Sequence, residues 1–547
     1  MSLTVLLQWG SGLMEQPAAA TSLLVLFLIP IVLFFIRLGF KSRKTKLNLP
    51  PSPPNKLPIL GHLLQLGKVP HVNLQHLARK HGSLMLLYLG NVPTLVVSSA
   101  ELVKQIFHTH DHVFASRPSS YVAKKFSYNY KDFAFTPYGE YWKQMRKICV
   151  LQLLNAKRIH LFRSIRTEEV ASMLDKISSG SRTSVSSSPE KKNFVAIDLT
   201  ETLMSFTSDV ICRVAFGRKY SDEEIIGRKF GDMVRDMFCL FTVENVGDFI
   251  PWLSWVNNFN GLYRKVDKTF KEIDGFLEVV VEEHIQVRKT RASSSTLSDF
   301  TTEEDLVDVL LGIHECGGST GDSLGRDNIK AIVLDIFIGA TDSSTSVLEW
   351  AMAELLRNPQ MMKQAQEEVR RIAKGKPNVT EDDLSEMHYL HAVIKETLRV
   401  HPSAPLLVPH QSTEISKLQG YDIPANAIVL TNAWAIGRDP ISWEEPGKFE
   451  PKRFMNSFID YKGQHFEFIP FGVGRRGCPG MQFAESVIEL ALANLLHRFD
   501  WVLPNGAKEY ELDMSEAGFG VITTKKTPLV VVAIDHLQTF HQSHTSV

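Results

Sequence analysis

The sequence predicts a mainly helical protein with small β-sheets behind a single N-terminal transmembrane helix. Three observations lead to this prediction: one long apolar segment near the start, amphipathic windows through most of the remainder, and few alternating, strand-like pieces. The chain has 547 residues, of which 44% are hydrophobic and 22% charged, as in ordinary globular proteins. This composition excludes a largely disordered, collagenous or polytopic membrane protein.

Charge and cysteine content exclude further classes of protein. The 60 Lys and Arg residues balance the 60 Asp and Glu residues, so no basic field indicates a nucleic-acid partner. The five cysteines are scattered and odd in number, with no C-x-x-C pair, which argues against a disulfide framework or a thiolate zinc site. We therefore expect a reducing compartment.

Residues 1–46 are expected to be a membrane anchor. Residues 17–36 carry no formal charge, and a helix of this length spans about 30 Å of hydrocarbon. Residues 37–46 contain basic but no acidic side chains and form a stop-transfer segment, whereas only Glu15 precedes the apolar run. The positive-inside rule then places the long C-terminal part in the cytosol. A cleaved signal peptide would carry its basic end before the apolar run, so we expect an uncleaved single-pass anchor.

Residues 47–61 are proline-rich and are expected to form a stiff hinge between the anchor and the body. Residues 62–547 contain no second long linker, so we expect them to form the functional domain. Its clearest helical windows are residues 359–373 and 387–400, and its strand-like pieces are residues 84–98, 428–431 and 529–533.

One cysteine, Cys478, stands in a loop rich in small residues. Gly472 to Gly477 spells G-x-G-x-x-G, but Pro470 interrupts the strand that a dinucleotide site needs, so we expect no such site. The glycines permit a tight loop close to a large planar cofactor, and a helix beginning near Pro479 would stabilise a thiolate. A lone cysteine in this setting suits the axial ligand of a haem iron.

The loop resembles that of the cytochrome P-450 family, the haem-thiolate monooxygenases, in its plant microsomal, membrane-anchored form. The resemblance implies a cytochrome P-450 fold, haem b (iron protoporphyrin IX) as cofactor, and Cys478 as the metal ligand. The family pattern F-x-x-G-x-R-x-C-x-G is matched at Phe471, Gly474, Arg476, Cys478 and Gly480, and the resemblance makes the four residues besides Cys478 cofactor-binding.

Two further motifs of the family follow in its order. Glu396 to Arg399 matches E-x-x-R, and residues 449–454 resemble F-x-P-E-R-F with Lys452 in place of the usual acid. The resemblance implies an ion triad of Glu396, Arg399 and Arg453 that locks the scaffold of the haem loop. Residues i and i+3 share a helix face, so one carboxylate can meet both guanidinium groups. The E-x-x-R spacing alone is weak evidence for the triad, because Glu367 and Glu368 also stand three residues before an arginine.

Trp142 and Arg146 match the family's W-x-x-x-R on one helix face. Both side chains are hydrogen-bond donors, and the resemblance makes them ligands of the haem propionates. His410 stands where many relatives have arginine, and whether it contacts a propionate stays open.

Residues 339–344 follow a long apolar helical run and would lie over the distal face of the haem. Small residues there would leave room for dioxygen and water, and an adjacent acid and alcohol can deliver protons. Asp342 and Ser343 are the predicted relay, with Thr341 as the third candidate, and Ser343 takes the family's usual Thr position. The alternative, which is compatible with the first, is a helix bent by hydroxyls bonded to its own carbonyls.

The resemblance implies a monooxygenase that uses O2 and electrons from NADPH to hydroxylate or epoxidise a small apolar metabolite, in plant specialised metabolism. Its expected partners are NADPH–cytochrome P-450 reductase and, as a further candidate, cytochrome b5. Its expected place is the endoplasmic reticulum membrane, with the catalytic domain facing the cytosol. By analogy, the pocket walls are Tyr121 to Phe135, Phe238 to Leu253, Ile336 to Ala340, Ala404 to Val408 and Gly518 to Ile522.

Two alternatives remain. One is a haem-thiolate isomerase or dehydratase acting on a hydroperoxide, which needs no reductase and no proton relay. The other is a non-catalytic haem sensor or binding protein.

Overall fold

The computed structural model describes residues 47–181, 195–220, 224–225, 228–242, 245–293, 304–316, 324–518 and 521–536. The chain divides into a small unit of residues 1–49 and 420–422 and a large unit of residues 50–419 and 423–547. The boundary after residue 49 falls within the predicted hinge. The predicted anchor and its basic segment lie outside the described residues, so both stay predictions.

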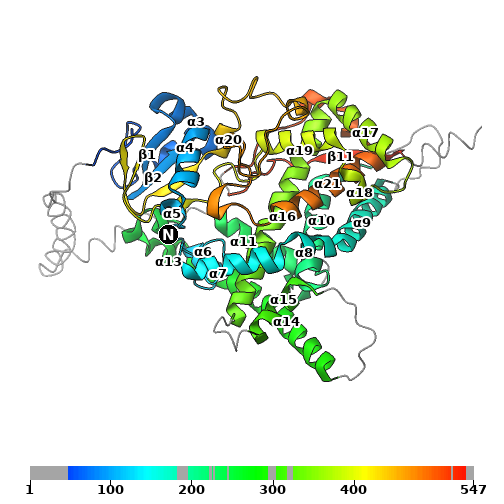
Figure 1. Cartoon of the computed structure of the whole chain (residues 1–547), viewed down its shortest axis with the longest axis horizontal. Helices are drawn as coiled ribbons and strands as arrows, with labels where there is room; N and C mark the ends of the chain where they lie inside the picture. Colours follow the sequence, from blue (N-terminus) through cyan, green and yellow to red (C-terminus); the bar gives the residue numbers. More distant parts are fainter. Residues whose placement is uncertain are drawn as a thin grey trace, which may run out of the picture. The chain divides into compact units, whose positions relative to one another are not determined.

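Helices dominate the large unit, as predicted (Figure 1). The longer helices are α3 (Pro70–His81), α9 (Arg163–Ser181), α10 (Leu199–Phe216), α11 (Phe230–Thr242), α14 (Leu262–Ser293), α15 (Leu306–Cys316), α16 (Arg326–Arg357), α17 (Pro359–Ala373), α19 (His388–Val400) and α21 (Met481–Arg498). The shorter α-helices are α4 (Ala100–Lys104), α5 (Asp111–Phe114), α6 (Tyr121–Phe126), α7 (Glu140–Ile148), α8 (Ala156–Leu161), α12 (Val246–Phe249), α13 (Val256–Phe259), α18 (Glu381–Leu384) and α20 (Ala433–Ile436). Single turns of other helix types are η1 (Leu63–Gln65), η2 (Gln105–Thr109), η3 (Cys149–Leu153), η4 (Pro251–Leu253), η6 (Pro451–Phe454), η7 (Gly474–Arg476), η8 (Pro504–Gly506) and η9 (Glu509–Glu511).

Two predicted helical windows are confirmed almost to the residue. The window at 359–373 is α17, which has Pro359 in its first turn, where a missing N–H costs nothing. The window at 387–400 is α19, which begins one residue later. Local capping sets other ends in the same way: the Asp198 carboxylate accepts a hydrogen bond from the Glu201 N–H at 3.0 Å and starts α10.

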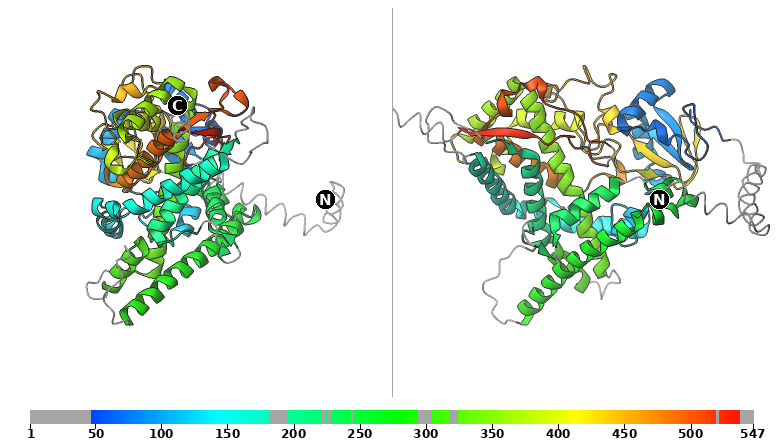
Figure 2. Two further views of the ribbon diagram at one scale, coloured as in Figure 1. Left: turned by 90° about the vertical axis from the view of Figure 1, so that its right-hand side faces the viewer. Right: turned by 180° about the vertical axis from the view of Figure 1, so that it is seen from behind.

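The sheets are small and lie apart from one another. The larger one has the order β1 (Leu84–Leu89), β2 (Val92–Val97), β9 (Ile428–Thr431) and β6 (His410–Gln411). The predicted strand at 84–98 is a hairpin, because Gly90 takes a φ of +60° and turns the chain between β1 and β2. The second sheet has the order β10 (Phe499–Val502), β11 (Val530–Asp535) and β3 (Ile197–Asp198), and the remaining strands are β4 (Glu224–Ile225), β5 (Arg228–Lys229), β7 (Ser416–Leu418) and β8 (Tyr421–Ile423). Seen from behind, β11 lies along the helical part, away from β1 and β2 (Figure 2).

Helix α16 is the central element of the large unit. It packs against α10, α15, α19 and α21 and is buried along residues 329–337 and 344–356 (Figure 1). Among the described residues it alone has the length and composition of a membrane span, but 72% of its apolar window is buried, as in a core helix. Residues 338–340, 342 and 343 are less buried, and the predicted relay residues Asp342 and Ser343 are among them.

Candidate active site

The loop around Cys478 is tight and fixed by its own backbone. The Cys478 N–H donates to the Phe471 carbonyl at 2.9 Å, and the Gly477 N–H donates to the Gly474 carbonyl at 3.1 Å. Gly474 has a φ of +76°, and a Cβ there would stand 3.0 Å from the Phe107 carbonyl oxygen, so only glycine fits. Gly480 is the N-cap residue of α21, which directs the helix N-terminus at this loop.

Cys478 differs from the buried cysteines in what surrounds its thiol. Its side chain is exposed, whereas Cys149 and Cys212 are buried. Burial nevertheless raises the pKa of Cys478, while the Gly480 N–H and the charge of Arg146 lower it. A metal ion bound to this exposed thiol would remove its proton.

Three buried or half-buried arginines lie behind the loop without enough acids to balance them. Arg476 donates to the carbonyls of Ala115 at 2.7 Å and Phe133 at 3.1 Å. Arg117 donates to the Val408 carbonyl at 2.7 Å, and Arg146 to the Gly477 carbonyl at 2.5 Å.

Burial lowers the pKa of Arg117 and of Arg476 to about 9. Repulsion among the three arginines lowers it further, and Asp132 acts in the opposite direction. The excess positive charge fits the two carboxylates of a haem. The exposed thiol and this arginine group together are what a haem-thiolate site requires.

The predicted propionate ligands lie beside this arginine group. Trp142 and Arg146 project from α7, and the Arg476 guanidinium stands 4.2 Å from the centre of the Trp142 ring. The indole N–H of Trp142 donates to the Phe133 carbonyl at 3.0 Å, so in this structure its donor is bonded to backbone. Contact with a propionate therefore stays a prediction for both residues.

His410 is buried in the same region. Its Nδ1 lies 2.8 Å from the Phe114 carbonyl oxygen, which fixes a proton on that nitrogen. Burial, and next the charge of Arg117, hold the pKa of His410 well below its ordinary value, so the ring is neutral. A neutral ring here adds no further positive charge to the arginine group.

The structure brings Glu396, Arg399 and Arg453 together. Arg399 Nε and Nη2 donate to the two Glu396 oxygens at 2.7 and 2.8 Å, and Arg453 Nε donates to Oε1 at 3.0 Å. The side chains of Glu396 and Arg399 are 0% exposed. The guanidinium of Arg399 also donates to the Gly437 carbonyl at 2.6 Å, which ties α19 to the chain that follows α20. Lys452 is exposed and takes no part, so its replacement of an acid leaves the triad intact.

The same spacing elsewhere makes no such triad. Glu367 on α17 is 66% exposed and pairs only with Lys363, at 3.8 Å. Arg370, three residues on, turns away and donates to Asp500 at 2.8 Å.

On α16, the three predicted relay residues have different partners. Thr341 is buried and its hydroxyl donates to the Phe337 carbonyl at 2.9 Å, and the Ser343 hydroxyl donates to the Gly339 carbonyl at 2.6 Å. These are the back-bonds of the helix-bending alternative. Within the described part of the chain the Asp342 carboxylate has no hydrogen bond or ion pair, and burial raises its pKa to about 6. A Cβ at Gly339 would meet no atom within 4 Å, so the helix borders open space there.

Sequence reasoning missed three residues of this region: Arg117, Asp132 and Asp335. Arg117 lies just before the predicted wall segment Tyr121 to Phe135, and the sequence predicts no role for it. Asp335 lies seven residues before Asp342 on α16, and this spacing of about two helical turns would have placed both on the same face.

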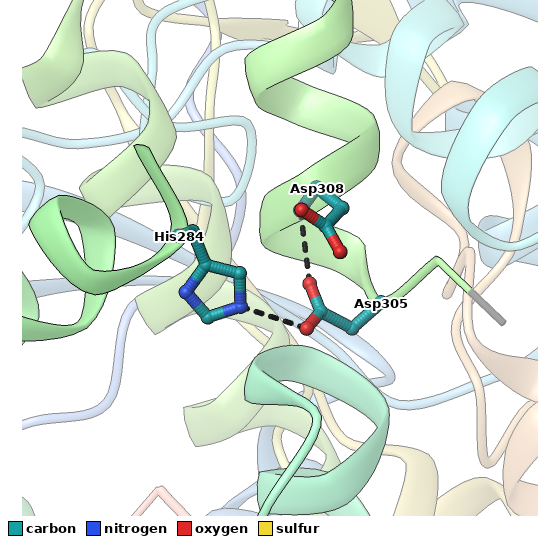
Figure 3. Close-up of side chains that lie close together, drawn as sticks. All are labelled: His284, Asp305 and Asp308. Atoms are coloured by element: carbon teal, nitrogen blue, oxygen red, sulfur yellow. Dashed lines mark hydrogen bonds and ion pairs between the residues drawn. The ribbon is translucent and has the colours of Figure 1, made fainter. Parts of the chain in front are cut away.

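A second group of ionisable side chains lies on α14 and α15, outside this site (Figure 3). His284 Nε2 is 2.8 Å from Asp305 Oδ2, and the ligand atoms of His284, Asp305 and Asp308 lie within 4.8 Å of one another. However, Asp305 also accepts the Asp308 N–H at 2.9 Å, as the cap of α15, and His284 Nδ1 bonds the Val280 carbonyl. Burial lowers the pKa of His284, but the hydrogen bond that its ring donates to Asp305 and the charge of that carboxylate outweigh burial and raise the pKa overall, as in an ion pair. These interactions are those of a helix cap and need no metal.

The chain is similar to known proteins over most of its length. A model of the family described as Cytochrome P450 matches residues 50–531. Cytochrome P450 736A117 of Prunus mume is 48% identical over 524 residues, which cover 95% of this chain and 96% of that protein. Strychnine-11-hydroxylase of Strychnos nux-vomica is 45% identical over 522 residues, covering 94% and 98% of the two chains. Norfluorocurarine oxidase of a Strychnos species is 45% identical over 507 residues, covering 92% and 96%.

Solved structures show the same fold. A zebra fish cytochrome P450 with abiraterone superposes with a TM-score of 0.69 at 24% identity, covering 85% of this chain and 99% of that one. The predicted fold class is confirmed.

Proposed function

This chain belongs to the cytochrome P450 family, and from that premise we propose which of its residues carry out the family's chemistry and on what kind of substrate. It is a haem-binding monooxygenase, with relatives named as a hydroxylase and an oxidase. When bound, the haem supplies the centre at which O2 is reduced with electrons that come from NADPH.

Cys478 is the axial ligand of the haem iron. The observation that carries this proposal is its exposed thiol in a glycine-fixed loop, with the N-terminus of α21 and Arg146 beside it. Arg476, Arg146 and Trp142 hold the propionates, with Phe471, Gly474 and Gly480 shaping the loop. The ion triad of Glu396, Arg399 and Arg453 holds the scaffold on which the loop rests.

Asp342 and Ser343 move protons on the distal side. A carboxyl whose pKa is about 6 both accepts and releases a proton near neutral pH, as a general acid must do in repeated turnover. The Ser343 hydroxyl lies on the same turn and exchanges its bond to Gly339 for one to a bound water. Thr341 is buried and bonded within the helix, which makes it the third candidate.

The substrate is a small apolar metabolite of plant specialised metabolism that is hydroxylated or epoxidised. The predicted wall segments, apart from residues 243–244 and 519–520, lie within the described residues. Aromatic rings join two of them: Phe135 stacks on Phe241 at 5.7 Å, and Phe126 lies 5.8 Å from the same ring. Such a wall suits an apolar ligand.

The electrons come from NADPH–cytochrome P-450 reductase, with cytochrome b5 as a further donor. The protein sits in the endoplasmic reticulum membrane through residues 17–36, with residues 62–547 as the haem domain in the cytosol. Deletion of residues 1–36 should release much of the protein from membranes and leave haem binding intact. Full-length protein found trimmed and secreted would contradict this orientation.

The decisive experiment measures NADPH oxidation with reductase over a library of plant metabolites, after a spectral screen for ligands that displace iron-bound water. Substrate-dependent NADPH consumption with oxygenated product is expected. Turnover driven by a hydroperoxide alone would favour the isomerase or dehydratase, and no turnover of any kind the haem sensor. The relatives named as a hydroxylase and an oxidase support the monooxygenase over both.

A further inference from the structure

The segment from Tyr128 to Thr136, which we call the clasp segment, starts with an unfavourable backbone. Tyr128, Asn129 and Tyr130 have φ values of +52°, +61° and +63°, three consecutive left-handed residues without a glycine. Such a turn persists only where surrounding contacts determine it strongly.

Helix α16 supplies those contacts. Lys131 pairs with Asp327 at 2.6 Å, at the start of the helix. Eight residues further on, the same Asp335 oxygen, Oδ2, accepts the N–H groups of Phe133 and Ala134, each at 3.0 Å. The clasp segment thus runs beside more than two turns of α16.

The Asp335 side chain also meets another carboxyl group. The side chains of Asp132 and Asp335 hydrogen-bond to each other, and their exposed fractions are 0% and 9%. Two buried carboxylates in contact repel unless they share a proton. Asp132 Oδ2 accepts the Phe135 N–H at 2.8 Å, and Asp132 Oδ1 lies 2.7 Å from the Thr136 hydroxyl, which also has two backbone carbonyls within reach. Burial raises the pKa of both carboxyl groups, and that of Asp335 further above its ordinary value. The shared proton therefore belongs to Asp335.

The carbonyl groups of the clasp segment point the other way, toward the arginines behind the haem loop. The Phe133 carbonyl accepts from Trp142 and Arg476, and the Ala134 carbonyl accepts from Arg117 at 3.0 Å. Its N–H groups are thus bound to the distal helix and its carbonyls to the proximal side. Between them Phe135 stacks on Phe241 in the proposed pocket wall.

We propose that Asp335 is a positioning residue that clamps the clasp segment onto α16 through the proton it shares with Asp132, and that loss of this proton releases the segment and opens the pocket wall. The clamp itself is a property of the fold. Only its effect on ligand passage rests on the proposed function.

Other ionisable groups facing the pair keep their charge state at pH 6 and 7.5. Burial raises the pKa of Cys149 well above its ordinary value and that of Tyr141 to about 12, so both stay neutral up to pH 9 as well. Arg117 and Arg476 face Asp132 as cations at pH 6 and 7.5, and because burial lowers their pKa to about 9, the Asp335→Asn variant serves to separate their titration from that of the pair. The pair of Lys131 and Asp327 is about half exposed and lies at the end of the segment.

The sign of the pH effect follows from the proton count. Burial, and next the charge of Asp132, raise the pKa of Asp335 well above its ordinary value, so the clamped state binds a proton that the released state lacks. Clamping is complete at low pH. It weakens by up to about tenfold per pH unit between the ordinary pKa of an aspartate, about 4, and the raised pKa of the clamped state, and it changes no further above that pKa.

Hydrogen–deuterium exchange tests the clamp on the haem-loaded full-length protein. Protection of residues 131–136, corrected for the intrinsic exchange rate, is measured at pH 6, 7.5 and 9 in the wild type and three variants. In Asp335→Asn an amide N–H replaces the shared proton while the amide oxygen keeps both backbone bonds, so we expect strong protection at every pH. Asp335→Ala should show weak protection at every pH. Asp327→Asn, a matched control on the same helix, should keep the wild-type pH dependence.

A wild-type protection that does not fall by pH 9, or an Asp335→Asn profile that falls in the same way, would overturn the shared-proton clamp. The pocket-wall part has its own readout, the dissociation rate of the apolar haem ligand 1-phenylimidazole. The rate should rise severalfold from pH 6 to 9 in the wild type and stay constant in Asp335→Asn. If the ligand dissociates at the same rate at pH 6 and 9 although the clasp segment is released, the pocket-wall part is overturned. The proposed monooxygenase function would be untouched by that result.

Discussion

Glu396 and Asp342 are both carboxylates inside the large unit, but the fold surrounds them differently. Glu396 accepts hydrogen bonds from Arg399, from Arg453 and from the Glu450 N–H at 2.7 Å, and it is fully buried. Asp342, on α16, has neither a donor nor a cation within the described residues, and burial raises its pKa to about 6.

This contrast distinguishes a carboxylate that stabilises the scaffold from one that is proposed to transfer protons. A carboxylate that accepts hydrogen bonds on both oxygens is fixed in one position. Its hydrogen bonds stabilise the contact between the segments that supply the donors. A carboxyl group without partners changes protonation state near neutral pH, which makes it useful in proton transfer and costly for stability. The predictions below test this separation, from the largest expected effect to the smallest.

The largest effect is expected at Cys478, the proposed ligand of the haem iron. Cys478→Ser should abolish monooxygenase activity and the red-shifted Soret band of the ferrous carbon monoxide complex, because a serine hydroxyl does not replace a thiolate. Cys316→Ser, at an exposed cysteine outside the predicted pocket walls, should keep both. A Cys478→Ser protein that retains the band would refute the assignment of the ligand.

The second prediction concerns the scaffold carboxylate. Glu396→Gln leaves two buried guanidinium groups without their counter-ion and should cost about 3–5 kcal/mol of unfolding free energy, with loss of haem. The measurement is haem content and urea unfolding. Glu367→Gln is the matched control, because its carboxylate is 66% exposed, and it should change stability by less than about 0.5 kcal/mol. Equal losses of stability in the two variants would show that the buried Glu396 contributes no more to the scaffold than the exposed Glu367.

The third prediction concerns the reactive carboxyl group. Asp342→Asn removes the proton donor and should lower product formed per NADPH oxidised, with a rate loss of about 10²-fold or less because water substitutes in part. Peroxide release should rise in step. An unchanged ratio of product to NADPH would assign the relay to other groups.

The fourth prediction concerns the stability of Asp342→Asn, which should rise although its activity falls. The raised pKa of Asp342 means that ionising it in the folded protein costs free energy, and this cost grows from about pH 4 and is complete above about pH 6. Asp342→Asn should therefore be more stable than the wild type at pH 7.5 by about 1–2 kcal/mol, since partial exposure reduces the effect. The difference should shrink toward pH 4.5, and thermal unfolding at the two pH values measures it. A variant less stable at pH 7.5 would show that Asp342 has a stabilising partner.

The smallest effect is expected at Ser343. Ser343→Ala removes one hydroxyl and its bond to the Gly339 carbonyl, but alanine is the better helix former, so stability should change by less than about 0.5 kcal/mol. Haem content should be normal, and product per NADPH should fall less than in Asp342→Asn. If the ratio stays at the wild-type value, the hydroxyl only bends the helix, and Thr341 or water completes the relay.

The family, the glycine-rich loop around Cys478 and the helical windows at 359–373 and 387–400 follow from the sequence alone. These features are local: glycines at fixed offsets, a repeated apolar spacing and one cysteine between small residues act within a few turns of chain. The apolar segment at 17–36 is local in the same sense, although it lies outside the described residues.

Which of the similar glutamate–arginine motifs forms the buried ion triad depends on the tertiary structure. Glu367 and Glu396 have the same local spacing to an arginine, but only Glu396 lies opposite Arg453 in a buried contact. Arg476 meets the carbonyl of Ala115 across 361 residues of sequence, and Asp335 meets the Phe133 N–H across 202. Burial and long-range partners set the charge and pKa of such groups, and neither is encoded within the few residues around them.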